Sequence, residues 1–147
     1  MALVERGEVT VEGFEFVTEQ LVELFPREAK NVMRQSVLEI AGQIRNRMRA
    51  TAPRRHGILK KAIFAKRSRG KPGLVEAEVR IRHGAGVKHD AYYWHMIEYG
   101  TVHSQPQPFA GPAVQAKAKT FQQDLRKVLD KRVVKMLEKR AKKQKLK

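Results

Sequence analysis

The sequence contains no cysteine and no long apolar run. Without cysteine, the chain can form neither a disulfide framework nor a thiolate metal site. No stretch reaches the roughly 20 apolar residues that a membrane-spanning helix needs, and the segment Met1–Arg6 does not have the composition of a signal peptide. These absences predict a protein without a membrane partner. It would be made in a reducing cytoplasm and either stay there or be built into a particle assembled there.

The residue spacings of common active sites are also missing. Four of the five histidines lie near Glu98 in the sequence, but they do not form the His-x-x-x-His or His-Glu-x-x-His spacing of a zinc site. The serines have no partnered histidine and aspartate, as nucleophilic catalysis would require. The glycines do not form a phosphate-binding loop. We therefore expect no catalytic residue, no metal, no cofactor and no enzymatic activity.

The charge is large and unevenly distributed. The 147 residues suffice for one domain and carry a formal net charge of +16. Residues 1–28 contribute −5, residues 29–116 contribute +11, and residues 117–147 contribute +10. An acidic start and a basic end suggest two partners of different character, and the basic end is the candidate for contact with a polyanion.

The hydrophobic pattern predicts an α+β fold with N-terminal helices, a small antiparallel β-sheet in the middle and a long basic C-terminal helix. Apolar residues at helical spacing predict helices over 13–24, over 27–50 and from Pro112 to about residue 140. Apolar and charged residues alternate over 75–82, which predicts a strand with one buried face. Its hairpin partner is expected at 59–66, around a turn at 69–73.

Shorter elements are expected between the sheet and the last helix. Residues 83–90 have the composition of a loop, and Asp90 could cap a short helix over 91–98 that Gly100 ends. Residues 101–111 are predicted to be extended, as a candidate further strand. The whole is expected to form one domain over 1–138, followed by a lysine-rich C-terminal extension over 139–147.

The densest pattern in the chain lies within residues 93–113, which contain four aromatic residues, one acid in an apolar setting and a Gly-Thr pair. Because a carboxylate buried alone is costly, Glu98 is expected to accept bonds from a loop backbone or an arginine. An intersubunit salt bridge and a catalytic role are the alternatives. Gly100 permits a tight turn, Thr101 can bond back to that turn, and Phe109 is expected to anchor the start of the last helix.

This pattern resembles the siphophage neck proteins, also called tail-completion or minor tail components, which take part in head–tail joining. That family carries a Tyr-Trp-x-x-Ile/Val-Glu-Phe/Tyr-Gly-Thr segment followed by Pro-Phe-x-x-Pro-Ala. The matching residues are Tyr93, Trp94, Ile97, Glu98, Tyr99, Gly100 and Thr101, then Pro108, Phe109, Pro112 and Ala113. An upstream Ala-Pro and Gly-x-Leu-Lys element matches 52–53 and 57–60. Ala110 and Gly111 depart from the bulky pair that usually precedes the second proline.

The resemblance implies a structural virion protein of the neck, between capsid and tail. Such a subunit forms a homo-oligomeric ring, a hexamer by analogy with tail symmetry, around the path of the double-stranded genome. Its partners are a head-closure or adaptor protein and a tail terminator or tail tube protein. The motif residues are then candidates for assembly contacts. Basic residues of the last helix are candidates for non-specific DNA contact or for an interface: Lys131, Arg132, Lys135, Lys139, Arg140, Lys142 and Lys143.

One alternative remains open at this point. The basic end would also suit a sequence-independent nucleic-acid-binding accessory protein. The sequence contains no Lys/Arg-Gly-Phe aromatic platform and no recognition helix that would favour this alternative. The salt dependence of duplex binding and the tendency to self-associate would separate the two functions.

Overall fold

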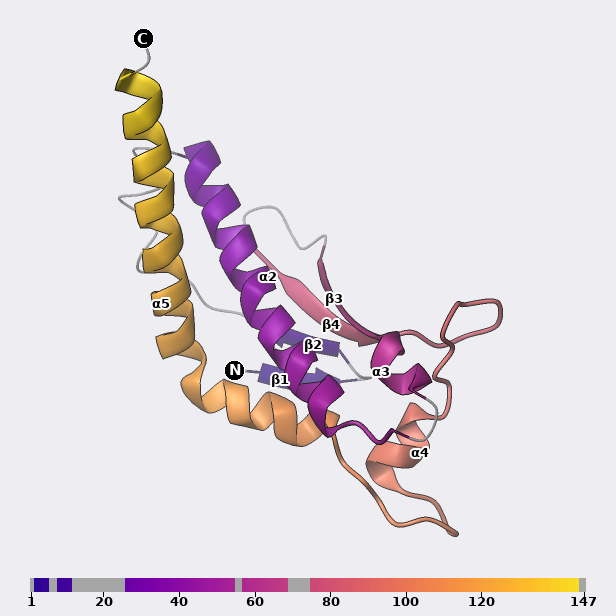
Figure 1. Ribbon diagram of the computed structural model, residues 1–147. Helices are drawn as coiled ribbons and strands as arrows, with labels where there is room; N and C mark the ends of the chain where they lie inside the picture. The colour runs from indigo at the N-terminus through magenta and orange to yellow at the C-terminus, as the bar shows by residue number, and fades with distance from the viewer. Residues whose placement is uncertain (1, 6–7, 12–25, 55–56, 69–74, 146–147) are drawn as a thin grey trace.

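The computed structural model describes residues 2–5, 8–11, 26–54, 57–68 and 75–145 (Figure 1). The predicted helix over 13–24 and the predicted turn at 69–73 lie outside these residues. The described elements, in chain order, are β1 (Ala2–Glu5), β2 (Glu8–Val11), α2 (Pro26–Thr51), α3 (Ile58–Ala62), β3 (Ile63–Arg67), β4 (Ala77–Ile81), α4 (Trp94–Tyr99) and α5 (Ala110–Lys145). The α+β class agrees with the prediction, and so does the order of α2, the central hairpin and the long C-terminal helix.

Helix α2 forms the centre of the fold. It extends one residue beyond the predicted range at each end, and proline at its first position suits a helix start because the missing N–H has no helical partner there. Its apolar stripe is buried, with Ile40, Ile44 and Met48 at 3% exposure or less. Helix α2 contacts both α5 and the β3–β4 hairpin (Figure 1). One continuous core therefore connects the two long helices with the sheet.

The central hairpin differs from the prediction at its first strand. Residues 58–62 form α3, and the strand begins only at Ile63, which pairs with Ile81 in an antiparallel register. The predicted strand over 59–66 is therefore wrong in its first half. Leu59 and Ala62 are both buried, and a single helical turn brings residues three apart to the same side of the backbone.

Strand β4 is also more buried than the sequence pattern indicates. Its apolar residues are buried as predicted, but Glu78 on the opposite face is only 9% exposed. Strand β2 lies beside β4. The Glu78 carboxylate forms ion pairs with Arg80, at 2.5 Å, and with Lys66, at 4.0 Å, as a buried charge requires. The prediction of a single buried face was therefore wrong for Glu78.

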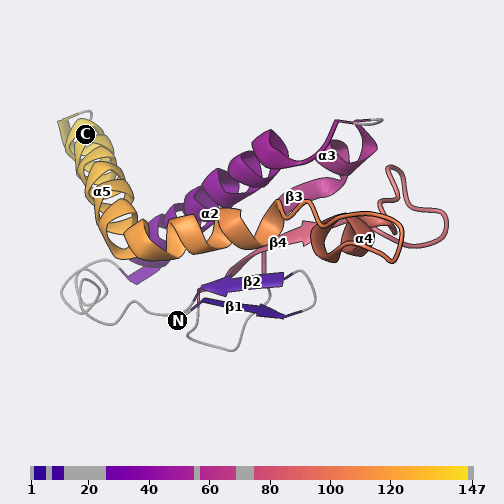
Figure 2. The same cartoon turned by 90° about the horizontal axis from the view of Figure 1, so that it is seen from below.

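A second hairpin precedes α2 and was not predicted from the sequence. Strands β1 and β2 pair antiparallel, with Leu3 opposite Thr10, and form a two-stranded sheet of their own. In Figure 2 this hairpin lies on the same side of the molecule as the first part of α5. Four-residue strands carry too few side chains to produce a clear period-two signal.

Helix α5 is longer than predicted. It begins at Ala110, two residues before Pro112, and continues through residues 139–145 of the predicted extension. Figures 1 and 2 show that α5 bends, so that its first part lies beside the β1–β2 hairpin and its second part runs antiparallel to α2. The inner face of this helix carries the buried side chains of Leu125, Val128 and Leu129. None of the described helices combines the length and apolarity that crossing a membrane requires.

The segments on either side of α4 correct two further expectations. Asp90 does not cap α4, which starts at Trp94 with Tyr93 at its N-cap and without a side-chain capping bond. The Asp90 carboxylate instead accepts hydrogen bonds from the backbone N–H groups of Gly84 and Tyr92, at 3.0 Å each, which closes the loop before the helix. Residues 101–108 form no strand, and contain only the isolated bridge between Thr101 and Ser104.

Candidate functional site

Helix α4 has two faces of different character. Trp94 and Glu98, four residues apart, are buried, with 3% and 7% of their surfaces exposed. Residues four apart lie on the same side of a helix, so this face packs into the protein. Tyr99 lies on the other side and is 71% exposed. The motif thus combines an inward-facing, structural half with an outward-facing half.

The Glu98 carboxylate caps the first turn of α5. Its Oε2 accepts hydrogen bonds from the backbone N–H of Phe109, at 2.8 Å, and of Ala110, at 3.0 Å, and its Oε1 accepts one from Gly111, at 2.8 Å. The first four N–H groups of a helix have no acceptor within the helix, and a negative charge at that end also interacts favourably with the helix dipole. Glu98 therefore has the predicted type of structural contact, with a loop and helix backbone as its partner.

The approach of this carboxylate depends on a small residue at position 111. A Cβ atom on Gly111 would lie 3.2 Å from Glu98 Oε1. The departure from the bulky pair of the related proteins therefore falls at a position where the carboxylate and the helix backbone are in close contact.

Gly100 directs the chain from α4 towards α5. It ends α4 with a φ of 77°, a region that side chains disfavour, as the sequence predicted for a tight turn. A Cβ atom here would lie 2.9 Å from both the Ser104 oxygen and the Pro106 nitrogen. Thr101 Oγ1 accepts a bond from His103 N, at 3.2 Å, which confirms that Thr101 bonds back to the turn. Gly100 is therefore required both by backbone geometry and by the lack of space.

Two more contacts close the connection between the helices. The N–H of Gln107 donates to the carbonyl of Ile97, at 2.8 Å, so the loop returns to the end of α4. Phe109 is fully buried, and its carbonyl accepts a bond from Thr51 Oγ1, at 3.3 Å, at the end of α2. The burial of Phe109 agrees with the predicted anchor, and the contact ties the start of α5 to the end of α2. We call residues 94–111 with these contacts the α4–α5 joint.

The remaining motif residues are more accessible. Tyr93 and Ile97 are partly buried against the core. Thr101, Pro108 and Pro112 are exposed. The exposed set also includes three neighbours that the sequence did not single out, namely Tyr92, Met96 and Val102. A spacing of four and then three residues from Tyr92 to Tyr99 could have indicated this second face, but the buried motif dominated the pattern.

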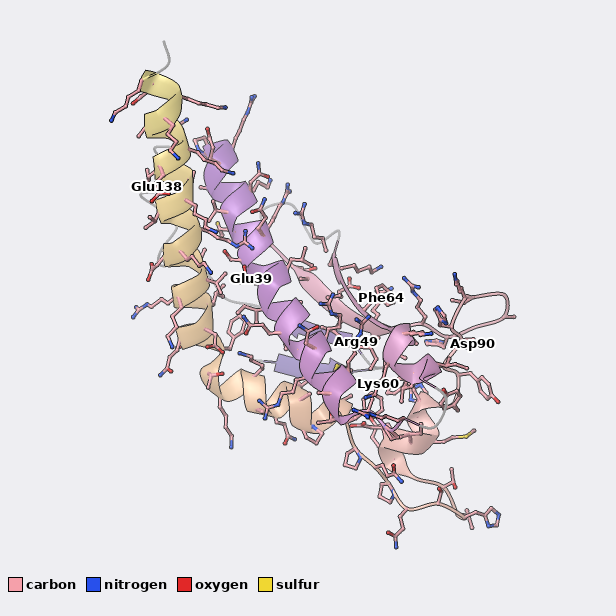
Figure 3. The ribbon with its side chains drawn as sticks, in the orientation of Figure 1. Glu39, Arg49, Lys60, Phe64, Asp90 and Glu138 are labelled. Carbon is pink, nitrogen blue, oxygen red and sulfur yellow. The ribbon has the colours of Figure 1, made fainter. Side chains whose placement is uncertain are left out.

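The basic residues of α5 fall into two groups. Arg132 donates to Glu39 Oε2, at 2.5 Å, and to Gln35 Oε1, at 2.7 Å, and Arg140 donates to Glu28 Oε1, at 2.7 Å. These arginines connect α5 to α2 (Figure 3, where Glu39 is labelled). The hydrogen bond from Arg140 holds the pKa of Glu28 below its ordinary value of 4.5. Both arginines, predicted to contact DNA or an interface, therefore make contacts within the protein.

The five candidate lysines in the second half of α5 are exposed to solvent. Lys131, Lys135, Lys139, Lys142 and Lys143 are exposed, and among the described residues none of them forms an ion pair. Three of them, Lys135, Lys139 and Lys143, line a groove of about 340 Å³ between α2 and α5. Val32 and Met136 also line this groove. The second half of α5 therefore presents a free positive surface beside its contact with α2.

The described part of the chain contains no group of three histidine, cysteine, aspartate or glutamate side chains that could hold a metal ion. Both carboxylate oxygens of Glu98 accept hydrogen bonds from backbone N–H groups at the start of α5, and none of these donors belongs to a histidine. The arrangement around Glu98 is thus that of a helix cap.

Comparison with known proteins identifies the family. A family model described as "Bacteriophage HK97-gp10, putative tail-component" matches residues 17–100. The match includes α2, the central hairpin and α4, and it ends at the glycine that turns the chain towards α5. Searches of curated proteins and of solved structures gave no significant match. The chain belongs to the HK97 gp10-like family, and it is a structural, non-enzymatic component of the tail and neck region of a phage virion.

Proposed function

We propose that the protein is a ring-forming subunit of the phage neck, placed between a head-closure or adaptor protein and a tail terminator or tail tube protein. The observation that carries this proposal is the family match over more than half of the chain. A cyclic ring needs a subunit whose two contact surfaces keep a fixed relation, because head-to-tail contacts close only when the rotation between copies is constant. The α4–α5 joint supplies such rigidity.

The motif residues would serve this assembly in two ways. Trp94, Glu98, Gly100 and Phe109 are buried or sterically restricted, so they would position the contact surfaces from within. Tyr99 is accessible and would make contacts itself. We infer that substitutions of the first group affect folding and assembly together, whereas a substitution of Tyr99 affects assembly alone.

The exposed lysines of α5 would face the DNA that passes through the ring. Contacts from lysine to phosphate hold a duplex without reading its sequence, which suits a channel through which the whole genome moves. The two arginines are left out of this set because their side chains already bond to Glu39 and Glu28. The proposed DNA-contacting set is therefore Lys131, Lys135, Lys139, Lys142 and Lys143.

The test is the oligomeric state of the purified protein, alone and with its tail partner, by native mass spectrometry and negative-stain imaging. A closed ring, hexameric by analogy with the tail, is expected. A strict monomer at high concentration, with no ring beside the tail partner, would overturn the proposal. If such a monomer bound free duplex with a steep salt dependence, the accessory nucleic-acid-binding function would be favoured instead.

A further inference from the structure

The large exposed apolar side chains gather at two places. Four of them, Tyr92, Met96, Tyr99 and Val102, lie on or beside α4, and we call them the end patch. Two more, Val134 and Leu137, lie on the second half of α5, and we call them the α5 patch. The other two such residues of the described chain, Ile58 and Val87, are at most 40% exposed. Clustered exposed apolar residues indicate an interaction site, whereas scattered ones do not.

The end patch is built as a firm surface. Met96 and Tyr99, three residues apart on α4, project on the side opposite Trp94, and Tyr92 lies in the turn just before the helix. Val102 is 98% exposed at the tip of the turn that the Thr101–Ser104 bridge closes. Tyrosine and methionine are also enriched at the centres of protein interfaces. The patch thus has the chemistry of a protein contact and a backbone that is already ordered.

The charge around the end patch is unusual for this chain. Residues 89–116 contain no lysine and no arginine, although the whole chain has 31 of them. The same range contains two acids, Asp90 and Glu98. Two copies of a protein with a net charge of +16 repel each other. The segment that carries the end patch therefore adds no positive charge of its own to a contact with a basic segment.

The α5 patch points away from α2 and lies in a basic segment, because residues 131–145 contain eight lysines and arginines and one acid. Arg132, Met136 and Arg140, at spacings of four residues, face α2 and the groove beside it. Val134 and Leu137 lie between these positions in sequence and are about half exposed. Because successive residues of a helix are rotated by about 100°, they occupy a different side of α5 from the residues that contact α2.

The two patches lie at opposite ends of the molecule. Figure 1 shows α4 at one end and the last turns of α5 at the other, and Figure 3 labels Asp90 near the first end and Glu138 near the second. A contact between equivalent patches would leave the other pair exposed. A contact from the end patch of one copy to the α5 patch of the next covers both, and it pairs the base-free surface with the basic one.

We propose that the end patch of one copy docks on the α5 patch of a second copy, as the repeating head-to-tail contact of the oligomer. This inference rests on the proposed ring function and names the surfaces that would form it. The side of α5 that carries Val134 and Leu137 contacts the neighbouring copy. The lysines that border the groove lie on another side and stay free for DNA.

A complementation experiment tests the contact. Met96→Ser/Tyr99→Ser removes the two apolar side chains of the end patch that lie on α4, and Val134→Ser/Leu137→Ser removes the α5 patch. All four positions are exposed, so the circular dichroism spectrum and the melting temperature should stay close to wild type. Each variant alone is expected to be monomeric by native mass spectrometry. An equimolar mixture is expected to form a dimer and nothing larger, because one intact contact remains. Gln122→Ser/Gln123→Ser, also exposed on α5, should assemble as wild type does.

Crosslinking gives an independent readout, made clean by the absence of native cysteine. With a short bismaleimide, Met96→Cys mixed with Val134→Cys should give a covalent dimer. Each variant alone, and Met96→Cys mixed with the control Gln122→Cys, should give at least tenfold less.

The outcomes separate this inference from the proposed ring. A ring in the wild-type protein without the mixed crosslink, or without complementation, overturns the assigned surfaces and leaves the ring function standing. The mixed crosslink in open filaments without closure supports the contact and overturns the ring. A monomer without any crosslink at high concentration overturns both.

Discussion

Removing the Glu98 carboxylate should destabilise the protein at one defined place. Alanine at this position leaves three backbone N–H groups without an acceptor, two of which, at Phe109 and Ala110, are buried. An unsatisfied buried donor costs about 1–3 kcal/mol. Water can reach Gly111, which is partly exposed, so that group costs less. We expect Glu98→Ala to lower the free energy of unfolding by about 3–5 kcal/mol.

Glu98→Gln keeps the shape of the side chain but removes its charge and its second acceptor oxygen. The amide oxygen can still accept from Phe109 and Ala110, but the amide NH₂ group then faces the N–H of Gly111, which is also a donor. We expect Glu98→Gln to lower the free energy of unfolding by about 1–3 kcal/mol, which is less than the effect of Glu98→Ala. At roughly 2–4 °C for each kcal/mol in a chain of this size, alanine should lower the melting temperature by about 6–20 °C.

The assay is thermal unfolding combined with hydrogen exchange of individual amides. The amides of residues 109, 110 and 111 should exchange slowly in the wild-type protein and lose protection selectively in both variants. Glu138→Gln, at an exposed position of α5 (Figure 3), is the matched control and should stay within about 0.5 kcal/mol of wild type. If both Glu98 variants matched this control and the three amides kept their protection, the capping argument would be refuted.

Two further substitutions and one truncation test other contacts of the two long helices and the turn. Gly100→Val should lower stability by at least about 2 kcal/mol and abolish ring formation, since its Cβ would meet the backbone of the next turn at 2.9 Å; normal particles carrying this change would contradict the geometry. Arg140→Gln should lower the melting temperature slightly at pH 7. The difference from wild type should shrink as the pH falls below 4.5 and vanish below the lowered pKa of Glu28, because the bond from Arg140 stabilises only the ionised carboxylate. An equal difference in acid and at pH 7, measured by calorimetry, would exclude that ion pair as the cause. Removal of residues 139–147 should leave assembly intact and reduce the salt slope of DNA binding by about 0.9 for each phosphate that the shortened protein no longer binds, whereas failure to assemble would make this segment an intersubunit arm.

The elements with strong local signals were predictable from the sequence. Helix α2 was placed within one residue at each end, because its apolar stripe is long and Pro26 and Pro53 bracket it. The start of β3 was not predictable, since residues 59–66 contain apolar side chains that suit either a helical turn or a strand. The β1–β2 hairpin was missed for a related reason, because its strands are too short for a periodic signal.

The candidate site was predictable in kind and not in detail. The sequence indicated that Glu98 needs hydrogen-bond donors, but the donors lie 11 to 13 residues further on and reach it only because the intervening loop turns back at Gly100. The sequence also did not show which basic residues of α5 bond to α2 and which do not. Arg132 and Arg140 resemble their lysine neighbours in sequence, and only the antiparallel packing of α2 on α5 brings them to Glu39 and Glu28. Long-range partners of this kind leave no local pattern.

The α4–α5 joint connects the two surfaces that would form the proposed contact between copies. The end patch is carried by α4 and the α5 patch by α5, and the only direct covalent path between these helices is the 100–109 segment. In a head-to-tail assembly, the angle between the two surfaces sets the rotation from one copy to the next, and therefore whether the assembly closes. Glu98 contributes to this angle by holding the first turn of α5 against α4 with three bonds, at a cost in desolvation that a freely exposed carboxylate would not have. In the proposed assembly, the buried acid of the motif would act without touching a neighbour, through the direction in which the long helix leaves.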